Sequence, residues 1–215
     1  MKVNELLLKR RSAALYDVNH NISDEEILTI TEAMRLSPSA YNLLSWRTVV
    51  VKRNKELRDV MLPMFYNQKN VRDASAIVFI IVSNYDKFLD NDIPDLINRL
   101  VDNDEERNLK YEEFLTKSLN IHKNDSKLAS WPLKEGYIAL GTSLATAEEI
   151  GIDTCAIEGM SKEKLTTFLQ TKKLIESNEE LATVLLLGKI DRSQKKSFKE
   201  KKIRLEKEKF TKIIG

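Results

Sequence analysis

Residues 37–47 read SPSAYNLLSWR and join an amphipathic helical pattern to a β-branched run. Pro38 ends the helix, because it lacks an N–H donor and its ring clashes with the preceding turn. The short polar side chains of Ser37, Ser39 and Asn42 can bond to nearby backbone or to a ligand. The large apolar side chains of the same loop need a surface to pack on. The stretch is either an ordinary helix–loop–strand joint or one wall of a ligand site.

Short-range patterns predict the elements on both sides of this loop. Upstream, Ser23 and Glu26 form an S-x-x-E capping box, which starts the helix that ends at the loop. Downstream, residues 48–51 are β-branched and predict a strand. Residues 54–65 predict a helix that Pro63 kinks or ends.

Two continuous apolar runs predict strands, the first of them in the middle of a sheet. Residues 75–82 (SAIVFIIV) show no alternation, so this strand is expected to be buried on both faces. Residues 182–188 (ATVLLLG) form a second such strand. Residues 66–72 are a polar loop at one strand end, where open sheets tend to bind ligands. Residues 153–159 (DTCAIEG) are predicted to be a short connection into a helix capped by Ser161.

Residues 131–150 predict the longest helix of the chain. Apolar and small residues cover more than one stripe, so this helix is expected to bury most of its circumference. It is either a core helix or a core helix that also forms a dimer interface. Gly151 then ends it. Residues 86–125 are highly charged and predict one or two surface helices, an insertion that could cover a site.

Both ends of the chain carry clustered charge. Near the N-terminus, Lys9, Arg10 and Arg11 follow a short helix over residues 4–10, where cations suit the C-terminal end of the helix dipole. The tail over residues 191–215 is mostly charged and of the kind that is usually solvated. Its apolar residues predict that it docks on another surface: Phe198, Ile203, Leu205, Phe210, Ile213 and Ile214.

Length and composition indicate one domain over residues 1–215. The chain is 42% hydrophobic and 32% charged, enough for a core and a polar surface, and its net charge is +2. No apolar run approaches the roughly 20 residues that span a bilayer. The first residues do not resemble a signal peptide, and one cysteine excludes an internal disulfide. We expect a cytoplasmic protein that binds neither membranes nor nucleic acid.

Several catalytic classes lack their residues in this sequence. Neither G-x-x-x-x-G-K-[ST] nor G-x-G-x-x-G occurs, which argues against phosphate binding by a glycine-rich loop. Two distant histidines and one cysteine do not make a zinc site. A nucleophilic pair of Cys155 with a histidine lacks any motif context. A bound cofactor is therefore expected to carry the chemistry.

Five segments, in order, resemble the FMN-dependent nitroreductase family, especially its branch with an N-Q-x-x-V loop. They cover nearly the whole chain: KRRSAALYD (9–17), SPSAYNLLSWR (37–47), YNQKNVRDASA (66–76), EGYIALGTSLATAEEIGIDTCAIEG (135–159), and LLLGKI (185–190) with KKIRL (201–205). No single one of these motifs is specific for the family, but the occurrence of all five in this order is.

The resemblance implies an α+β fold in which helices flank a central, mainly antiparallel sheet. It also implies an intertwined homodimer with FMN at the interface, the helix from Trp131 in the dimer core, and the tail wrapped around the partner. The activity implied is an NAD(P)H oxidoreductase working in two steps. NAD(P)H reduces the flavin and leaves, and a nitroaromatic, quinone or similar small acceptor then takes the electrons. No side chain is expected to act as a nucleophile or base.

The resemblance also assigns residues to the cofactor. The FMN phosphate and ribityl chain would bind to Arg10, Arg11 and Ser12, with Lys202 and Arg204. The loop from the partner subunit would supply Pro38, Ser39, Ala40 and Asn42. The polar edge of the flavin would bond to Asn67, Gln68 and Asn70, and its ring would lie against Ala156, Ile157, Glu158 and Gly159. By position, the acceptor pocket would include Tyr41, Leu44 and Phe114.

Three departures from the family pattern bear on function. Ala14 stands where a Lys or Arg is usual, which removes a cation near the flavin. Leu44 and Ser45 replace a Gln-Pro pair, and Glu206 stands where Pro is common. A flavin-binding protein with little turnover, an FMN reservoir or regulator, is the alternative function that these changes leave open. A nucleic-acid binder using the basic tail is disfavoured, because acidic residues are interspersed there.

Overall fold

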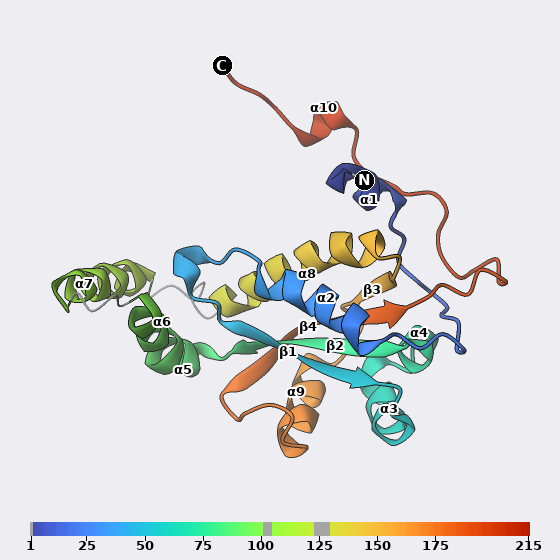
Figure 1. Cartoon of the computed structure of the whole chain (residues 1–215), viewed down its shortest axis with the longest axis horizontal. Helices are drawn as coiled ribbons and strands as arrows, with labels where there is room; N and C mark the ends of the chain where they lie inside the picture. Colours follow the sequence, from blue (N-terminus) through green and yellow to red (C-terminus); the bar gives the residue numbers. More distant parts are fainter. Residues whose placement is uncertain (1, 101–104, 123–129) are drawn as a thin grey trace.

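The structure is a computed structural model and describes residues 2–100, 105–122 and 130–215. Within these ranges four antiparallel strands form one sheet in the order β1-β2-β4-β3. The strands are β1 (Trp46–Lys52), β2 (Ala76–Ser83), β3 (Asp153–Ile157) and β4 (Glu179–Gly188). Helices lie on both faces of the sheet (Figure 1). The predicted α+β fold with a mainly antiparallel sheet is confirmed.

Both apolar runs form strands, as predicted, and the first is an inner strand as expected; the second, in β4, is the other inner strand. Every residue of β2 is buried, because its alternate side chains enter two different cores. One set points towards α2 and α8: Ala76, Val78, Ile80 and Val82. The other set points towards the opposite layer: Ile77, Phe79 and Ile81.

Helices α2 (Asp24–Arg35) and α8 (Trp131–Glu149) cover one face of the sheet. The predicted capping box at the start of α2 is present, with Glu26 N–H donating to Ser23 Oγ at 3.1 Å. In α8, Gly136 allows the helix to approach the sheet closely. A Cβ at this position would lie 2.9 Å from the Cβ of Ala182.

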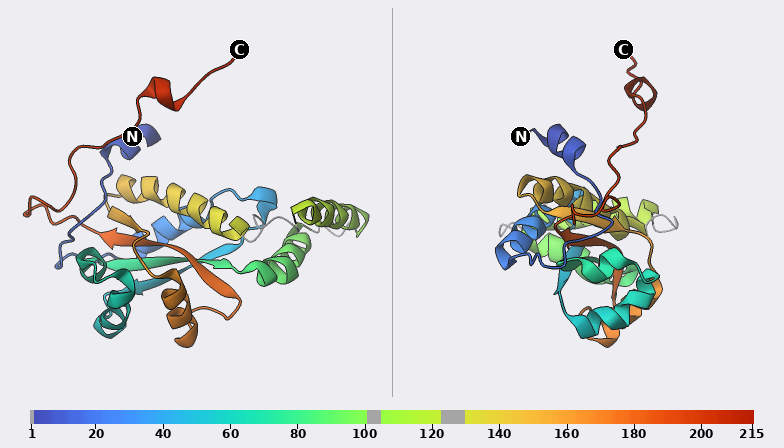
Figure 2. Two further views of the ribbon diagram at one scale, coloured as in Figure 1. Left: turned by 180° about the vertical axis from the view of Figure 1, so that it is seen from behind. Right: turned by 90° about the vertical axis from the view of Figure 1, so that its right-hand side faces the viewer.

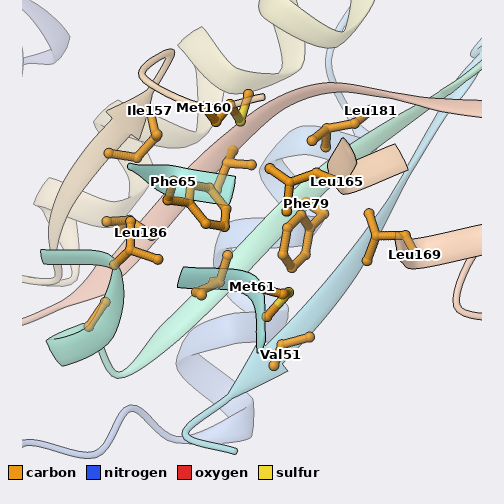
Figure 3. Packing of buried hydrophobic residues seen from close by; sticks show 14 of the residues in the cluster. Val51, Met61, Phe65, Phe79, Ile157, Met160, Leu165, Leu169, Leu181 and Leu186 are labelled. Atoms are coloured by element: carbon orange, nitrogen blue, oxygen red, sulfur yellow. The ribbon is translucent and has the colours of Figure 1, made fainter. Parts of the chain in front are cut away.

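The opposite face is covered by α3 (Lys55–Met61), a 3₁₀ turn (Leu62–Phe65), α4 (Lys69–Asp73) and α9 (Lys162–Thr171). Pro63 sits where α3 changes into the 3₁₀ turn, as the sequence predicts. Figure 3 shows Met61, Phe65 and Leu165 packed around Phe79 of the central strand. Large side chains thus fill this layer, which anchors the polar segment that precedes β2.

Residues 85–100 and 105–122 project from one end of the sheet (Figure 1). They form α5 (Tyr85–Lys87), a π-helical turn (Phe88–Asp92), α6 (Ile93–Leu100) and α7 (Glu105–His122). They have a small core of their own, in which Phe88, Leu96 and Leu115 surround Leu43 of the 37–47 loop. The insertion predicted over 86–125 is helical where it is described. Residues 101–104 and 123–125 lie outside the described residues.

The N-terminal segment and the C-terminal tail both lie beyond α8, on the outer side of that helix (Figures 1 and 2). Helix α1 (Val3–Lys9) contacts α8, whereas the tail and its helix α10 (Lys207–Phe210) extend away from the body in both views of Figure 2. Phe198 packs against the main core, but Ile203, Phe210 and Ile213 are 77–90% exposed. That the tail docks on a partner stays a prediction.

Three local predictions are wrong and one holds in part. Residues 153–157 are the edge strand β3, which is too short to show a strand pattern in sequence. Ser161 is the N-cap residue of α9, as predicted, but its side chain accepts no capping hydrogen bond. The predicted polar loop over 66–72 continues into α4. Finally, α8 does not bury most of its circumference in one chain, since Tyr137 and Ile138 are 38% and 44% exposed.

Candidate functional site

A cavity of about 800 Å³ lies between the N-terminal segment and the tail. Its wall brings together side chains that are far apart in sequence. Eight are basic and none of the described lining residues is acidic: Arg10, Arg11, Lys195, Lys196, Lys199, Lys201, Lys202 and Arg204. The remaining lining residues include Ser12, Ala14, Asn70 and Cys155. The cavity thus gathers the residues predicted to bind the FMN phosphate and ribityl chain, together with Asn70. These residues are Arg10, Arg11, Ser12, Lys202 and Arg204.

The positive charges that line this cavity repel one another and lower the pKa of neighbouring basic side chains. Burial lowers the pKa of Arg10, and the positive charge of Arg204 lowers it further. Burial also lowers the pKa of Lys202, with Arg10, Arg11 and Arg204 adding to the effect. A bound anion would relieve this repulsion, since guanidinium and ammonium groups make charge-assisted bonds to phosphate oxygens.

Hydrogen bonds orient the side chains of Arg10 and Arg11. Arg10 Nη1 donates to Ser12 Oγ at 3.2 Å, so both side chains lie on the same wall. Arg11 instead donates to the carbonyls of Leu8 at 2.7 Å and Lys9 at 2.8 Å, which satisfies the C-terminal end of α1. Arg11 therefore braces the helix end while it also lines the cavity with Arg10 and Arg204.

The polar segment before β2 is held against the end of β3. Gln68 Nε2 donates to the carbonyls of Gly159 at 2.5 Å and Phe65 at 3.0 Å. Asn70 Nδ2 lies 3.8 Å from Cys155 Sγ, beside the cationic cavity. Asn67 is exposed at φ 57°, a left-handed backbone that Asn tolerates better than most residues. Of the three predicted flavin-edge residues, Gln68 thus contacts the predicted ring-face residue Gly159, and Asn70 contacts Cys155 of β3.

The end of β3 presents backbone rather than a continuous wall of side chains. Ala156, Glu158 and Gly159 are exposed, whereas the side chain of Ile157 is buried in the core and could meet a ligand only through its main chain. The Tyr137 hydroxyl donates to Glu158 Oε1, and the Thr183 hydroxyl donates to the same oxygen at 3.2 Å. Burial and this contact with Glu158 raise the pKa of Tyr137 to about 12.

A second cavity, of about 620 Å³, lies between the 37–47 loop and the insertion. Three of the predicted loop residues, Ser39, Tyr41 and Asn42, line it with Phe114 of α7. The other lining residues, none of which was predicted to be a site residue, are Ile97, Arg107, Lys110 and Tyr111. Pro38, Ala40 and Leu44 lie in the same loop but do not line the cavity. Leu44, predicted to be an acceptor-pocket residue, is 39% exposed outside it.

Glu135 on α8 fixes this loop, a role that the sequence analysis missed. Its side chain is 3% exposed, and Oε1 accepts hydrogen bonds from the Ala40 N–H at 2.9 Å and the Trp131 indole at 3.0 Å. Oε2 is buried without a partner among the described residues. Burial raises the pKa of this carboxyl. A charged residue inside a largely apolar helix was the available signal.

The loop has a strained backbone. Tyr41, Asn42 and Leu44 have φ values of 55°, 58° and 50°, in the left-handed region that bulky residues rarely adopt. Ser39 Oγ accepts a hydrogen bond from the Leu44 N–H at 3.1 Å and supports this shape. Strain of this kind persists only where surrounding contacts impose it, and it is common at ligand sites.

The two cavities lie at opposite ends of the sheet. Ser12 forms a bridge with Thr154 of β3, and Thr154 pairs with Leu187 of β4. Leu187 pairs with Ala76 of β2, and Ala76 pairs with Lys52, the last residue of β1. Ser12 therefore lies at the Lys52 end of the sheet. The 37–47 loop leads into Trp46, at the start of β1. Trp46 and Lys52 are six residue steps apart along β1, or about 20 Å. In Figure 1 the loop that leads into β1 and the segment that follows α1 lie at opposite ends of the sheet. One chain does not bring all the predicted cofactor residues together.

Other kinds of site were sought in the described part of the chain. Residues 2–100, 105–122 and 130–215 contain no group of three His, Cys, Asp or Glu side chains arranged to hold a metal ion. Over the same ranges, no helix combines the length and apolar character needed to cross a membrane.

Comparison with known proteins identifies the family of this chain from its sequence and finds solved structures that share its fold. The model of the Nitroreductase family matches residues 7–189. A Haemophilus influenzae protein named as a candidate NAD(P)H nitroreductase is 32% identical over 187 residues, which cover 85% of this chain and 84% of that protein.

Solved structures share the fold. A nitroreductase-like protein from Streptococcus mutans superposes with a TM-score of 0.83 at 19% identity, covering 99% of this chain and 98% of the other. A candidate nitroreductase from Exiguobacterium sibiricum, crystallised in complex with FMN, superposes with a TM-score of 0.75 at 22% identity, covering 100% and 98% of the two chains. The family match over most of the chain and the shared fold agree: this protein is a member of the nitroreductase family.

Proposed function

We propose that this protein is an FMN-dependent NAD(P)H oxidoreductase that reduces a small acceptor such as a nitroaromatic or a quinone. The observation that carries the proposal is the cationic cavity around Arg10, Ser12 and Lys202, which has no acidic residue among its described lining residues. Its eight cations suit a phosphate ester, and its volume lies in the range of small-molecule sites. The residues present therefore fit the cofactor that the family relationship suggests.

The proposed cofactor contacts follow from where the side chains lie. Arg10, Ser12, Lys202 and Arg204 would hold the phosphate, with Arg11 bracing the adjacent helix end. Asn70, with Asn67 and Gln68, would contact the flavin edge, and the main chain of residues 156–159 would lie against the ring. Bound FMN would supply the redox chemistry, taking a hydride from NAD(P)H and passing two electrons to the acceptor. The protein's own tasks are to bind, orient and desolvate.

A homodimer is part of the proposal. The loop residues Pro38, Ser39, Ala40 and Asn42 lie at the far end of the sheet from Arg10, so a second copy would have to bring them to the cofactor. Two features of the single chain support such an assembly. Helix α8 leaves Tyr137 and Ile138 exposed, and the tail presents large apolar residues such as Ile213, which is 90% exposed. Burying such surface favours association.

For a quinone acceptor the proposed reaction balances as NAD(P)H + H⁺ + quinone giving NAD(P)⁺ + hydroquinone. The hydride and the proton supply the two hydrogens of the product; NAD(P)H is the reductant and the quinone is the oxidant.

The test is an absorbance spectrum of the purified protein before and after anaerobic addition of NADH or NADPH. Flavin bands that bleach, and return when menadione is added, are the expected result. Absence of flavin bands, even after FMN is supplied, would overturn the proposal. Bands that stay unbleached would favour a flavin-binding protein with little turnover, for which the neutral Ala14 in the cavity wall is the supporting observation.

A further inference from the structure

The cavity between the 37–47 loop and α7 combines an aromatic wall with a cationic one. Tyr41 and Phe114 meet edge to face with centroids 6.0 Å apart, and Phe114 lies 6.2 Å from Tyr111. Tyr41 and Phe114 are 36% and 51% exposed, so ring surface is available to a ligand. Aromatic walls of this kind suit a flat, conjugated molecule.

The cationic wall comes from the same face of α7. Arg107, Lys110, Tyr111 and Phe114 follow a spacing of three, one and three residues, which places all four along one side of a helix. No acidic residue is among the described residues that line this cavity. Glu106 pairs with Lys110 at 2.6 Å, but both side chains are at least 72% exposed, so an incoming anion can compete for the ammonium group.

The opposite wall is rigid enough to impose a geometry. Tyr41 is held by stacking on Trp131 at 6.0 Å, and Trp131 is itself held by Glu135. Leu43, two residues along the loop, is 1% exposed in the core of the insertion, and Arg99 donates to its carbonyl at 3.4 Å. The ring of Tyr41 thus faces α7 from a loop that is anchored on both sides. Ser39 and Asn42 add neutral polar groups at the same wall.

From this arrangement we infer that the cavity selects flat, conjugated acceptors that carry an anionic group, such as a carboxylate or sulfonate. The aromatic side chains would contact the conjugated part, while Arg107 and Lys110 would bind the anion and fix which end of the molecule points out of the site. The inference rests on the proposed function, because in a homodimer this cavity would adjoin the cofactor of the partner chain.

The test compares 4-nitrobenzoate with 4-nitrobenzamide, which are similar in size and differ in charge. For either compound, ArNO₂ + NADPH + H⁺ gives ArNO + NADP⁺ + H₂O, with one N–O bond broken and its oxygen leaving as water. The quantity measured is the ratio of kcat/KM for the acid to kcat/KM for the amide. Taking this ratio within each variant cancels the difference in intrinsic reactivity and any general loss of activity.

We expect Arg107→Met and Lys110→Met each to lower this ratio about fivefold, and the double variant to lower it about twentyfold, as for partly solvated charges a few ångströms apart. Lys164→Met, which removes the same charge from an exposed position on α9, is the matched control and should leave the ratio unchanged. High salt should lower the wild-type ratio, because it screens exposed charges.

The possible results separate the inference from the proposed function. A ratio that stays within about twofold in the double variant, while both compounds are reduced, overturns the inference and leaves the oxidoreductase proposal standing. An equal fall of the ratio in Lys164→Met also overturns it, because the effect would then be one of net charge. If a flavin-loaded protein reduces neither compound nor menadione, the proposed function fails and the inference falls with it.

Discussion

Arg47 and Glu179 join the edge strand β1 to the start of β4 through a two-pronged ion pair. Nε lies 2.8 Å from Oε1, and Nη2 lies 2.5 Å from Oε2. Lys87 adds a contact to Oε1 at 2.9 Å, and the Glu176 N–H donates to Oε2 at 2.9 Å. Burial alone would raise the pKa of Glu179, but these bonds outweigh it and lower the pKa to about 2. Charge, rather than apolar contact, closes this end of the sheet.

Glu179→Gln should make the protein less stable and flatten its response to acid. A carboxylate with a lowered folded-state pKa stabilises the fold above its unfolded value of 4.5, and this stability is lost as pH falls towards about 2. We expect a loss of about 2 kcal/mol at neutral pH, less than the full shift implies because Arg47 is partly in solvent. Urea unfolding across that pH range measures it. Asp59→Asn, in an exposed pair with Lys55, is the control and should change little.

Glu135→Gln should have the opposite effect on pH dependence. Burial raises the pKa of Glu135, so its contribution is most favourable at acidic pH and is lost as pH rises through its folded-state value. The amide oxygen of Gln can still accept from the Ala40 N–H, without a buried charge. We expect the variant to gain about 1 kcal/mol over wild type between about pH 4 and about pH 8. If the stabilities of wild type and Glu135→Gln differ by the same amount at every pH, the idea is refuted. The control Glu163→Gln, at an exposed position, should show such a constant difference from wild type.

Gly136→Ala should destabilise the fold although alanine is the better helix former. The new Cβ would lie 2.9 Å from Ala182 Cβ and 3.2 Å from Val82 Cγ1. We expect a net loss of about 1–3 kcal/mol, since overpacking exceeds the helix-propensity gain of about 1 kcal/mol. Adding Ala182→Gly should recover part of the loss in a double-mutant cycle. Strictly additive effects would show that the close approach is not the cause.

Ala14→Lys should raise the reduction potential of bound FMN. Ala14 lines the cationic cavity, and its N–H donates to the Ser197 carbonyl at 2.7 Å, so the backbone there is fixed. A lysine would add the positive charge that the family usually has here, and a cation favours the more negative, reduced cofactor. We expect a rise of about 20–40 mV in a spectroelectrochemical titration. Ala14→Gln, similar in length but neutral, should leave the potential unchanged, and equal shifts in both variants would count against the charge effect.

The sequence predicted those parts of the fold in which one local pattern dominates. The apolar run over 75–82 can be satisfied only between two layers, and Ser23 with Glu26 forms a capping box in the structure as in the pattern. The strand β3 was missed because its two buried residues, Thr154 and Ile157, lie on opposite faces of the strand and so give no alternating pattern. Long, repetitive burial is visible in sequence, and a five-residue edge strand is not.

The candidate site was predictable only in part, for a related reason. Arg10, Ser12 and Lys202 were grouped through the family resemblance, and the fold gathers them into one cavity. Arg107 and Lys110 were not singled out, since a cation on a charged helix looks like any other until the opposite wall is known. Glu135 was missed because the role of a buried carboxylate depends on which backbone N–H the fold brings to it.

Arg10 and Ser39 lie at opposite ends of one sheet. In the proposed assembly, each cofactor site would therefore be built from residues of two chains. A chain with a damaged 37–47 loop would spoil the site built on its healthy neighbour, whereas its own Arg10 would still form a working site with the neighbour's intact loop. Conversely, a chain defective only at Arg10 and a chain defective only in the loop would together restore one working site per mixed pair. Two inactive alleles would then complement each other.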